Sequence, residues 1–155
     1  MKYSTKINTM IMDAMKNGEK FKSETYKALK NEFLKLVTAK GAKYTNINEI
    51  PDAEEIRIIN KMIKERNESA DIYEKNGRKD LALPERFEAE HLQALVPQAA
   101  SVSDINNAII KYVEEYGDFD QKKMGLVIKY VKEQFDNVDG GLVAGQVKAY
   151  LNGHE

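Results

Sequence analysis

Apolar residues recur every three or four positions along most of the chain, which is the pattern of amphipathic α-helices. In the first 97 residues this pattern predicts four helices, over about 4–16, 23–39, 52–76 and 80–96. Pro84 lies inside the last stretch, so we expect that helix to begin at Pro84 after a lead-in turn. The longest stretch follows Pro51 and opens with three acidic residues, as a helix N-terminus favours: Asp52, Glu54 and Glu55.

Three shorter helices follow the low-charge segment 98–102 and are predicted over about 104–116, 120–135 and 141–151. We expect Ser103 to cap the first of them and Gly117 to end it. Strict alternation of apolar and polar residues, the pattern of strands, occurs only in short runs that do not compete with these helices. The sequence therefore predicts an all-α fold, with a four-helix N-terminal domain over 1–97 and a small three-helix C-terminal domain over 98–155.

Residue usage excludes several kinds of chemistry. The 155 residues contain no Cys and two His, which excludes disulfides, thiolate catalysis, iron–sulfur clusters and zinc ribbons. Uncharged runs fall far short of the ~20 residues that a membrane-spanning helix needs. We also expect no signal peptide, because the first apolar stretch is interrupted by Asn8 and Asp13. These observations predict a cytoplasmic protein with no catalytic residues, no cofactor, no metal and no membrane contact.

Charge gives no general attraction to nucleic acid. The chain has 24 basic and 25 acidic residues, a net charge of −1. Residues 98–155 hold six Lys and nine acidic residues, a net charge of −3, which leaves 18 basic and 16 acidic residues in 1–97. Neither half has the basic excess of tight nucleic-acid binders, so a binding role depends on local groups.

Two short patterns resemble metal sites but lack the required ligands. Glu88 and His91 form one Glu-x-x-His step, whereas a di-iron bundle uses two such steps and two further Glu. A calcium loop counted from Asp136 would place Val138 at the third position and Val147 at the twelfth, where oxygen ligands are needed. A capped turn between helices explains the second pattern better.

Arg66 lies on the apolar seam of the predicted helix 52–76. A buried guanidinium costs several kcal/mol unless it is paired, so Arg66 needs a carboxylate or a phosphate. One interpretation is a structural ion pair with Glu88 or Glu90 on the next helix. The other is an anion site formed by four cations of this region: Lys64, Arg66, Arg78 and Lys79.

Three groups of residues carry a family signature. The first is Lys64, Arg66, Ser69, Tyr73, Gly77, Arg78 and Leu81, with Leu95-Val96-Pro97 closing the next helix. The second is Lys123-Met124-Gly125-Leu126-Val127 and Val138-Asp139-Gly140, followed by Val143, Val147 and Leu151. The third is the opening Met12-Asp13-Ala14-Met15-Lys16. In this order, and over nearly the whole chain, they resemble the YqeY family of small bacterial proteins.

The resemblance implies an N-terminal helical domain and a C-terminal three-helix domain similar to the tail of GatB, the B subunit of the tRNA-dependent glutamine amidotransferase. In that enzyme the tail touches the outer corner of tRNA, while a separate domain forms the amide with ATP. The family's inherited label is carbon–nitrogen ligase activity with glutamine as amido donor. This chain has only the tail, without a magnesium–ATP site or a Ser-Lys pair, so an independent ligase activity does not follow.

The resulting hypothesis is a non-catalytic helper that binds tRNA or a tRNA-handling protein. Its expected contacts in the C-terminal domain are Lys122, Lys123, Lys129, Asp139, Gly140 and Gly141, and we expect Lys122, Lys129 and Lys132 to share one side of a helix. The family usually carries Lys or Arg around the Asp-Gly turn, and this chain does not, which weakens phosphate attraction. The alternative hypothesis is a protein–protein adaptor that binds no nucleic acid.

Overall fold

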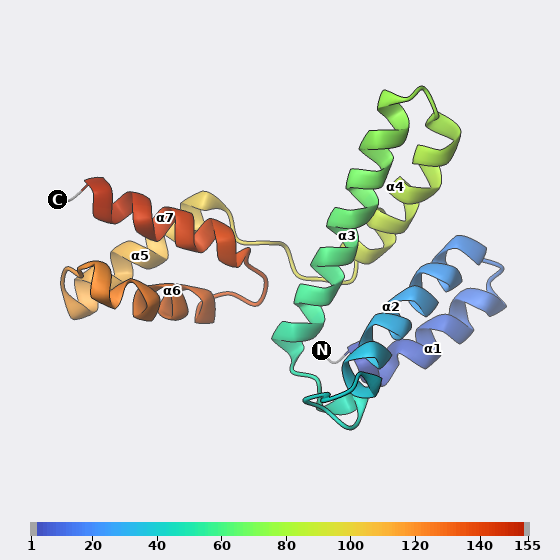
Figure 1. Ribbon diagram of the computed structural model, residues 1–155, viewed down its shortest axis with the longest axis horizontal. Helices are drawn as coiled ribbons and strands as arrows, with labels where there is room; N and C mark the ends of the chain where they lie inside the picture. Colours follow the sequence, from blue (N-terminus) through green and yellow to red (C-terminus); the bar gives the residue numbers. More distant parts are fainter. Residues whose placement is uncertain (1–2, 154–155) are drawn as a thin grey trace. The chain divides into compact units, whose positions relative to one another are not determined.

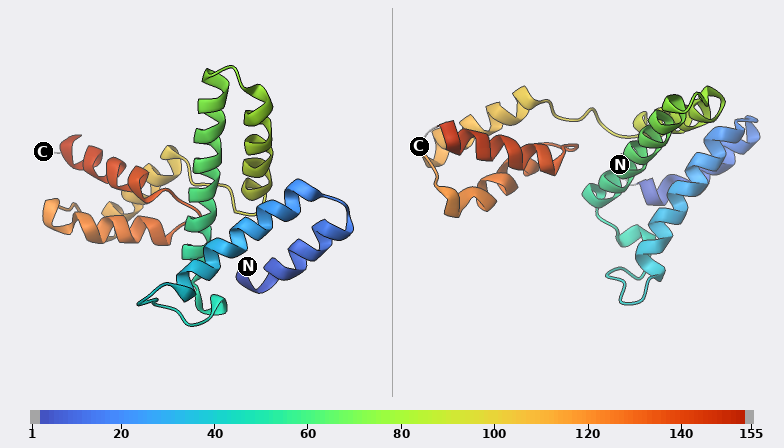
Figure 2. Two further views of the ribbon diagram at one scale, coloured as in Figure 1. Left: turned by 45° about the vertical axis from the view of Figure 1, so that its right-hand side comes forward. Right: turned by 45° about the horizontal axis from the view of Figure 1, so that its top comes forward.

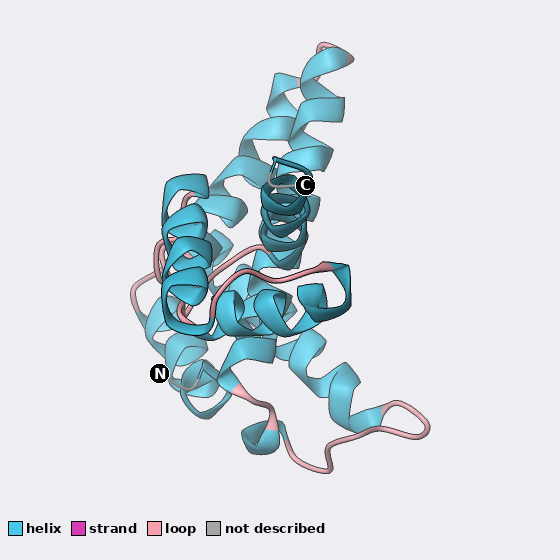
Figure 3. Cartoon of the chain, turned by 90° about the vertical axis from the view of Figure 1, so that its left-hand side faces the viewer, coloured by secondary structure: helices cyan, strands magenta, loops and turns pink. Residues whose placement is uncertain are grey.

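Helices account for the regular structure in the computed structural model, which describes residues 3–153. Seven α-helices and two short 3-10 helices form within that range, and it contains no strand. Figure 3 shows the helices joined by loops alone. The prediction of an all-α fold is therefore confirmed. The chain divides into two units, Met1–Val96 and Pro97–Glu155, which are called the first and the second unit below.

The first unit begins with a helical hairpin. Helix α1 (Tyr3–Lys16) and helix α2 (Lys20–Thr38) are joined by a tight turn at Gly18. The φ angle of Gly18 is 69°, a left-handed conformation that glycine adopts without steric strain. Figure 1 shows the two helices side by side.

A second hairpin completes the first unit. The short η1 (Ile47–Glu49) leads into α3 (Asp52–Lys75), which turns at Gly77 into α4 (Lys79–Gln93). In Figure 1 and in the left view of Figure 2, the turn end of this hairpin extends away from α1. The core lies where the two hairpins meet, and its buried side chains are Tyr3, Ile7, Ile11, Ala14, Tyr26, Leu29, Phe33, Ile50, Ile59, Met62 and Leu92.

One carboxylate lies inside this apolar core. Glu55, in the first turn of α3, is fully buried. Its Oε2 accepts the backbone N–H of Tyr3 at 2.7 Å and that of Ser4 at 3.4 Å, while its Oε1 accepts the Ser4 hydroxyl at 2.8 Å. The first N–H groups of a helix have no hydrogen-bond partner within that helix, and a capping residue just before the helix usually accepts from them. Here Glu55, on α3, accepts from the first N–H groups of α1 instead.

The fourth helix differs from the sequence prediction at both ends. It begins at Lys79, with Pro84 inside it, and ends at Gln93 rather than Val96. The expectation that the helix starts at Pro84 is wrong. A proline in a helix removes one hydrogen bond, here to the carbonyl of Asp80. Burial of Ala82, two residues earlier, in the hairpin of α3 and α4 favours helix in spite of that loss.

The second unit consists of three helices: α5 (Val102–Tyr116), α6 (Met124–Glu133) and α7 (Gly140–Gly153). Its core is formed by apolar side chains of all three and of the loop after α5: Ile105, Ala108, Ile109, Tyr112, Phe119, Val127, Val131, Val143 and Val147. The buried amide of Asn137 donates to the carbonyl of Pro97 at 2.6 Å, and its backbone carbonyl accepts the N–H of Ala100 at 2.9 Å. Asn137 thereby fixes the segment that leads into α5.

Two boundaries in the second unit correct the sequence prediction. Ser101, not Ser103, caps α5: its hydroxyl accepts the N–H of Asp104 at 3.0 Å, and the Asp104 carboxylate accepts the N–H of Ser101 at 2.9 Å. The stretch predicted as one helix over 120–135 is a 3-10 turn, η2 (Gln121–Lys123), followed by the shorter α6.

Within residues 3–153, no helix combines the length and apolarity needed to cross a membrane.

Candidate nucleic-acid interface

Arg66 is paired with a carboxylate of the neighbouring helix. Its Nε lies 3.1 Å from Oε2 of Glu88, and both side chains are less than one quarter exposed. Two alanines on the facing sides of α3 and α4, Ala70 and Ala89, are buried close to the pair and allow the helices to approach closely. The ion-pair interpretation of Arg66 is confirmed, with Glu88 as the partner.

The other three cations expected around Arg66 have different surroundings. Arg78 makes two hydrogen bonds of 3.1 Å to Asp80 at the start of α4, and Lys64 lies 3.9 Å from Glu68 on α3. Lys79 is exposed at the first position of α4. Arg66 lies nine residues before the end of α3, about 14 Å along the axis from the turn that carries Arg78. The structure does not bring the four cations together.

Arg86, the most extensively bonded cation of this hairpin, was not predicted as a site from the sequence. Its guanidinium donates to the Asn67 side chain at 3.1 Å, to Asp71 at 2.6 Å and to Glu74 at 3.4 Å. These three acceptors follow the spacing i, i+4, i+7, so they form one stripe of α3 facing α4. This spacing of polar residues on α3 is visible in the sequence and could have predicted a hydrogen-bonded partner for Arg86.

Lysines of the second unit gather at the start of α6. The Asp120 side chain caps η2 and accepts the N–H groups of Lys122 at 3.0 Å and Lys123 at 3.3 Å. Lys129 is exposed on α6. The expectation that Lys122 shares a helix side with Lys129 and Lys132 is wrong, because Lys122 belongs to η2 and only the other two lie on α6.

The turn Asp139-Gly140-Gly141 lies at the other end of α6. Oδ1 of Asp139 accepts the N–H groups of Gly141 at 2.8 Å and Leu142 at 3.2 Å, so the carboxylate caps α7, as expected of a capped turn. A side chain placed at Gly140 would bring its Cβ to 3.4 Å from Nζ of Lys132. Lys132 is therefore the cation next to this turn, and α6, about 15 Å long, separates the turn from Lys122 and Lys123.

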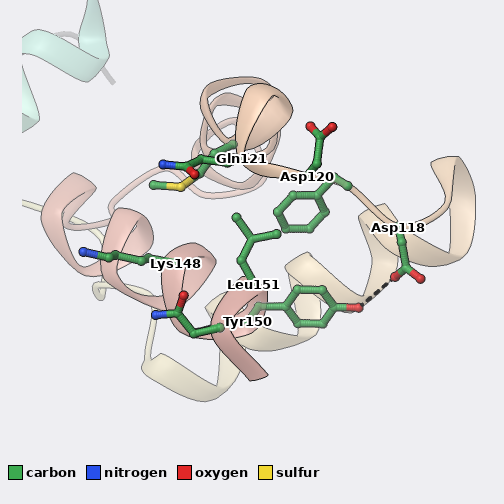
Figure 4. Close-up of a pocket in the computed structure, with 9 residues that line it drawn as sticks. Asp118, Asp120, Gln121, Lys148, Tyr150 and Leu151 are labelled. Atoms are coloured by element: carbon green, nitrogen blue, oxygen red, sulfur yellow. Dashed lines mark hydrogen bonds between the residues drawn. The ribbon is translucent and has the colours of Figure 1, made fainter. Parts of the chain in front are cut away.

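A pocket of about 430 Å³ opens where α7 ends against the loop between α5 and α6. It is called the α7 pocket below, and its lining residues are Asp118, Phe119, Asp120, Gln121, Met124, Lys148, Tyr150, Leu151 and Asn152. Figure 4 shows Leu151 at its centre and Lys148 on the side opposite Asp118; the Asp118 carboxylate is directed at the Tyr150 hydroxyl, and the Asp120 carboxylate points away from Leu151.

Two aromatic rings form part of the pocket lining. The rings of Phe119 and Tyr150 are stacked, with centroids 5.4 Å apart and an interplanar angle of 15°. The Tyr150 hydroxyl donates to Asp118 at 3.3 Å. Burial and, secondarily, the Asp118 carboxylate raise the pKa of Tyr150, so its hydroxyl keeps the proton that it donates. None of this lining was predicted as a site from the sequence.

The comparisons with known proteins identify a family. The chain matches the family described as Yqey-like protein over residues 4–151, which includes both units and nearly all of the sequence. A search of curated proteins returned no match. The matched region includes every residue of the three groups that carried the resemblance noted from the sequence. The chain therefore belongs to the Yqey-like protein family.

Proposed function

We propose that this protein is a non-catalytic accessory protein that associates with tRNA through its second unit. The observation that carries the proposal is the family match over residues 4–151, together with the resemblance of the three-helix unit to the tail of GatB. The contacts proposed are Lys122 and Lys123 in η2, Lys129 on α6, and the turn Asp139-Gly140-Gly141.

The side chains available for phosphate contact differ between the two ends of α6. At the turn, the Asp139 carboxylate already accepts the N–H groups of Gly141 and Leu142. A phosphate there would therefore be attracted mainly by the ammonium group of Lys132. At η2, by contrast, the backbone N–H groups of Lys122 and Lys123 are capped but their ammonium groups extend from an exposed turn. We therefore propose η2 as the main phosphate contact.

In the first unit, the cations Lys64, Arg66, Arg78 and Lys79 make a weaker case for an anion site. Arg66 and Arg78 are engaged by Glu88 and Asp80, so a phosphate would have to displace a carboxylate from each. We therefore assign Arg66 and Arg78 to structural ion pairs and not to tRNA contact.

The test is the affinity of the full-length chain for tRNA, measured by fluorescence anisotropy at low and at moderate salt. Because few phosphates can be neutralised by a unit of net charge −3, we expect weak binding that decreases as salt rises. An affinity no better than that of a helical control protein of similar net charge would overturn the proposal. Glutamine- and ATP-dependent product formation by the purified chain would contradict its non-catalytic part.

The alternative function, a protein–protein adaptor without nucleic acid, is favoured by one feature of the first unit. Leu83 and Phe87 lie one turn apart on α4 and are 57% and 43% exposed. Such an apolar pair on one helix side is typical of helices that dock against a protein partner. Capture of a partner that survives nuclease treatment, and is lost in a Leu83→Ser/Phe87→Ser variant, would support this alternative.

A further inference from the structure

We propose that the α7 pocket receives a single unstacked nucleobase of the bound RNA. This inference rests on the proposed function and specifies how the second unit would hold tRNA. The volume of about 430 Å³ falls within the range of roughly 300–1,000 Å³ that is common for sites of small organic groups.

The apolar part of the lining suits a flat aromatic ligand. Phe119 and Tyr150 contribute their stacked rings, and Met124 and Leu151 add a thioether and a branched side chain. Proteins that recognise RNA by sequence mostly target unpaired bases, which they pack against aromatic side chains. Because Phe119 is 8% exposed and belongs to the core, the position of its ring is fixed before any ligand binds.

The polar part of the lining suits the edge of a base. Gln121 lines the pocket from η2, and Asn152 lines it from the end of α7. Each side-chain amide offers both donors and an acceptor, the combination that pairs with the ring nitrogens and exocyclic groups of nucleobases. Two amides on different elements can therefore read one base.

The charges around the pocket suit the phosphates that flank such a base. Lys148 belongs to the lining, and Lys122 and Lys123 directly follow Gln121 in the chain. The lining itself holds one lysine and two aspartates, so the cations available to a phosphate are Lys148 in the lining and Lys122 and Lys123 next to it in the chain. The pocket and the proposed phosphate contacts at η2 are thus continuous.

The carboxylates make a cationic occupant less suitable than a base. Asp118 accepts the Tyr150 hydroxyl, and Asp120 accepts two backbone N–H groups of η2. Figure 4 shows the Asp118 carboxylate directed at the Tyr150 hydroxyl and the Asp120 carboxylate pointing away from Leu151. Both carboxylates are thus already bonded within the chain, and Lys148 in the lining would repel a guanidinium.

The first experiment is an NMR titration of the full-length chain with AMP, GMP, CMP and UMP in turn. Ribose 5-phosphate tests the sugar and phosphate alone, and arginine amide tests a guanidinium. We expect the nucleotides to shift amide signals of residues 118–124 and 148–152, and ribose 5-phosphate to leave Leu151 and Asn152 unchanged. Shifts in both segments with arginine amide but not with nucleotides would overturn the inference and assign the pocket to a protein side chain.

The second experiment compares tRNA affinities of matched variants. Tyr150→Leu removes the stacked ring and should weaken binding about tenfold, since stacking of one base on an aromatic side chain has an effect of that order. Tyr150→Phe keeps the ring and should bind within about twofold of the unchanged chain, as should Tyr116→Leu, which removes an exposed tyrosine outside the pocket.

A second pair of variants covers the case in which Tyr150→Leu does not fold. Lys148→Gln should weaken tRNA binding severalfold, whereas Lys111→Gln, an equal charge change at an exposed position of α5, should not. If the unchanged chain binds tRNA and the pocket variants bind equally well, the inference fails while the proposed function stands. If the unchanged chain does not bind tRNA, the proposed function fails and the nucleotide titration alone decides about the pocket.

Discussion

The two units each use one buried polar side chain to hold their first segment, an acid in the first unit and an amide in the second. In the first unit the carboxylate of Glu55 binds the start of α1, 51 and 52 positions away in the sequence. In the second unit the amide of Asn137 binds the carbonyl of Pro97, 40 positions away.

This difference indicates how strongly the position of the first segment of each unit depends on its buried polar side chain. A buried carboxylate is expensive unless several donors surround it, so α1 has to lie where its N–H groups meet Glu55. A buried amide tolerates the loss of a hydrogen bond better, because no uncompensated charge remains. We therefore expect the first unit to depend more on its polar anchor than the second unit does.

Replacing the anchor of the first unit should have the largest effect. Glu55→Gln keeps the shape but places an NH₂ group against the donors of Tyr3 and Ser4. We expect the free energy of unfolding of the first unit to fall by about 3 kcal/mol, as when one partner of a buried charged interaction is lost. The measurement is urea denaturation followed by NMR signals of each unit.

The matched control is Glu68→Gln, on the same helix but exposed and 3.9 Å from Lys64. It should change the free energy of unfolding by less than about 0.5 kcal/mol. Equal effects of the two substitutions would show that Glu55 is not the anchor of α1.

Replacing the anchor of the second unit should have a smaller effect. Asn137→Ala removes the 2.6 Å hydrogen bond to Pro97 and should lower the free energy of unfolding of the second unit by about 2 kcal/mol. Asn107→Ala, at an exposed position of α5, should be neutral or slightly stabilising, because alanine is the better helix former. A loss from Asn137→Ala larger than that from Glu55→Gln would reverse the comparison.

The pair of Arg66 and Glu88 should contribute less than either anchor, since both side chains keep some contact with water. A double-mutant cycle with Arg66→Met and Glu88→Gln should give a coupling energy of about 1 kcal/mol in the first unit. The exposed pair of Arg78 and Asp80, tested in the same way, should show no measurable coupling. Equal coupling in the two cycles would remove the distinction between the partly buried pair and the surface pair.

The smallest expected effects are pH dependences of opposite sign in the two units. In the second unit, hydrogen bonds from the backbone and side chain of Ser101 lower the pKa of Asp104 below its ordinary 3.8. The folded unit therefore favours the ionised form, and this stabilisation is present above pH 3.8 and disappears as pH falls through the lowered pKa. Asp104→Asn should destabilise the second unit at neutral pH but not in strong acid.

In the first unit, burial and then the Glu88 carboxylate raise the pKa of Glu85 above 4.5, with Arg66 acting in the opposite direction. The folded unit disfavours ionised Glu85, so a destabilisation sets in as pH rises through the raised pKa. Glu85→Gln should thus stabilise the first unit at neutral pH and have no such effect well below pH 4.5. Thermal unfolding of both variants across this pH range checks the signs, and a shift of the same sign in both units would contradict them.

Much of the fold could be predicted from the sequence because helix periodicity and glycine stops are local signals. Gly117, for example, ends α5 as predicted, with a φ of 84°. The start of α4 could not be predicted, because the burial of Ala82 in the hairpin of α3 and α4 is tertiary and outweighs the local effect of Pro84. The same holds for the cap of α5, where both Ser101 and Ser103 fit the local pattern.

The features of the candidate sites also divide into those that could be predicted from the sequence and those that depend on tertiary packing. The Arg66 pair could be predicted, because a cation on an apolar seam requires a partner on the adjacent helix. The role of Glu55 could not, since three acids at the start of α3 suggest only the dipole of that helix. The α7 pocket also depends on tertiary structure, because its lining comes from two segments about 30 residues apart.

The central claim is that tRNA binding resides in the second unit, and a charge-matched comparison of two triple variants tests it most directly. One variant carries Lys122→Gln, Lys123→Gln and Lys129→Gln in the second unit. The other carries Lys6→Gln, Lys27→Gln and Lys61→Gln, three exposed positions of the first unit.

The quantity to measure is tRNA affinity as a function of salt. The account predicts that the second-unit variant loses about tenfold or more in affinity and that its salt dependence becomes shallower by about 2, whereas the first-unit variant stays within about threefold of the unchanged chain. Equal losses in the two variants, or a larger loss from the first-unit variant, would contradict it.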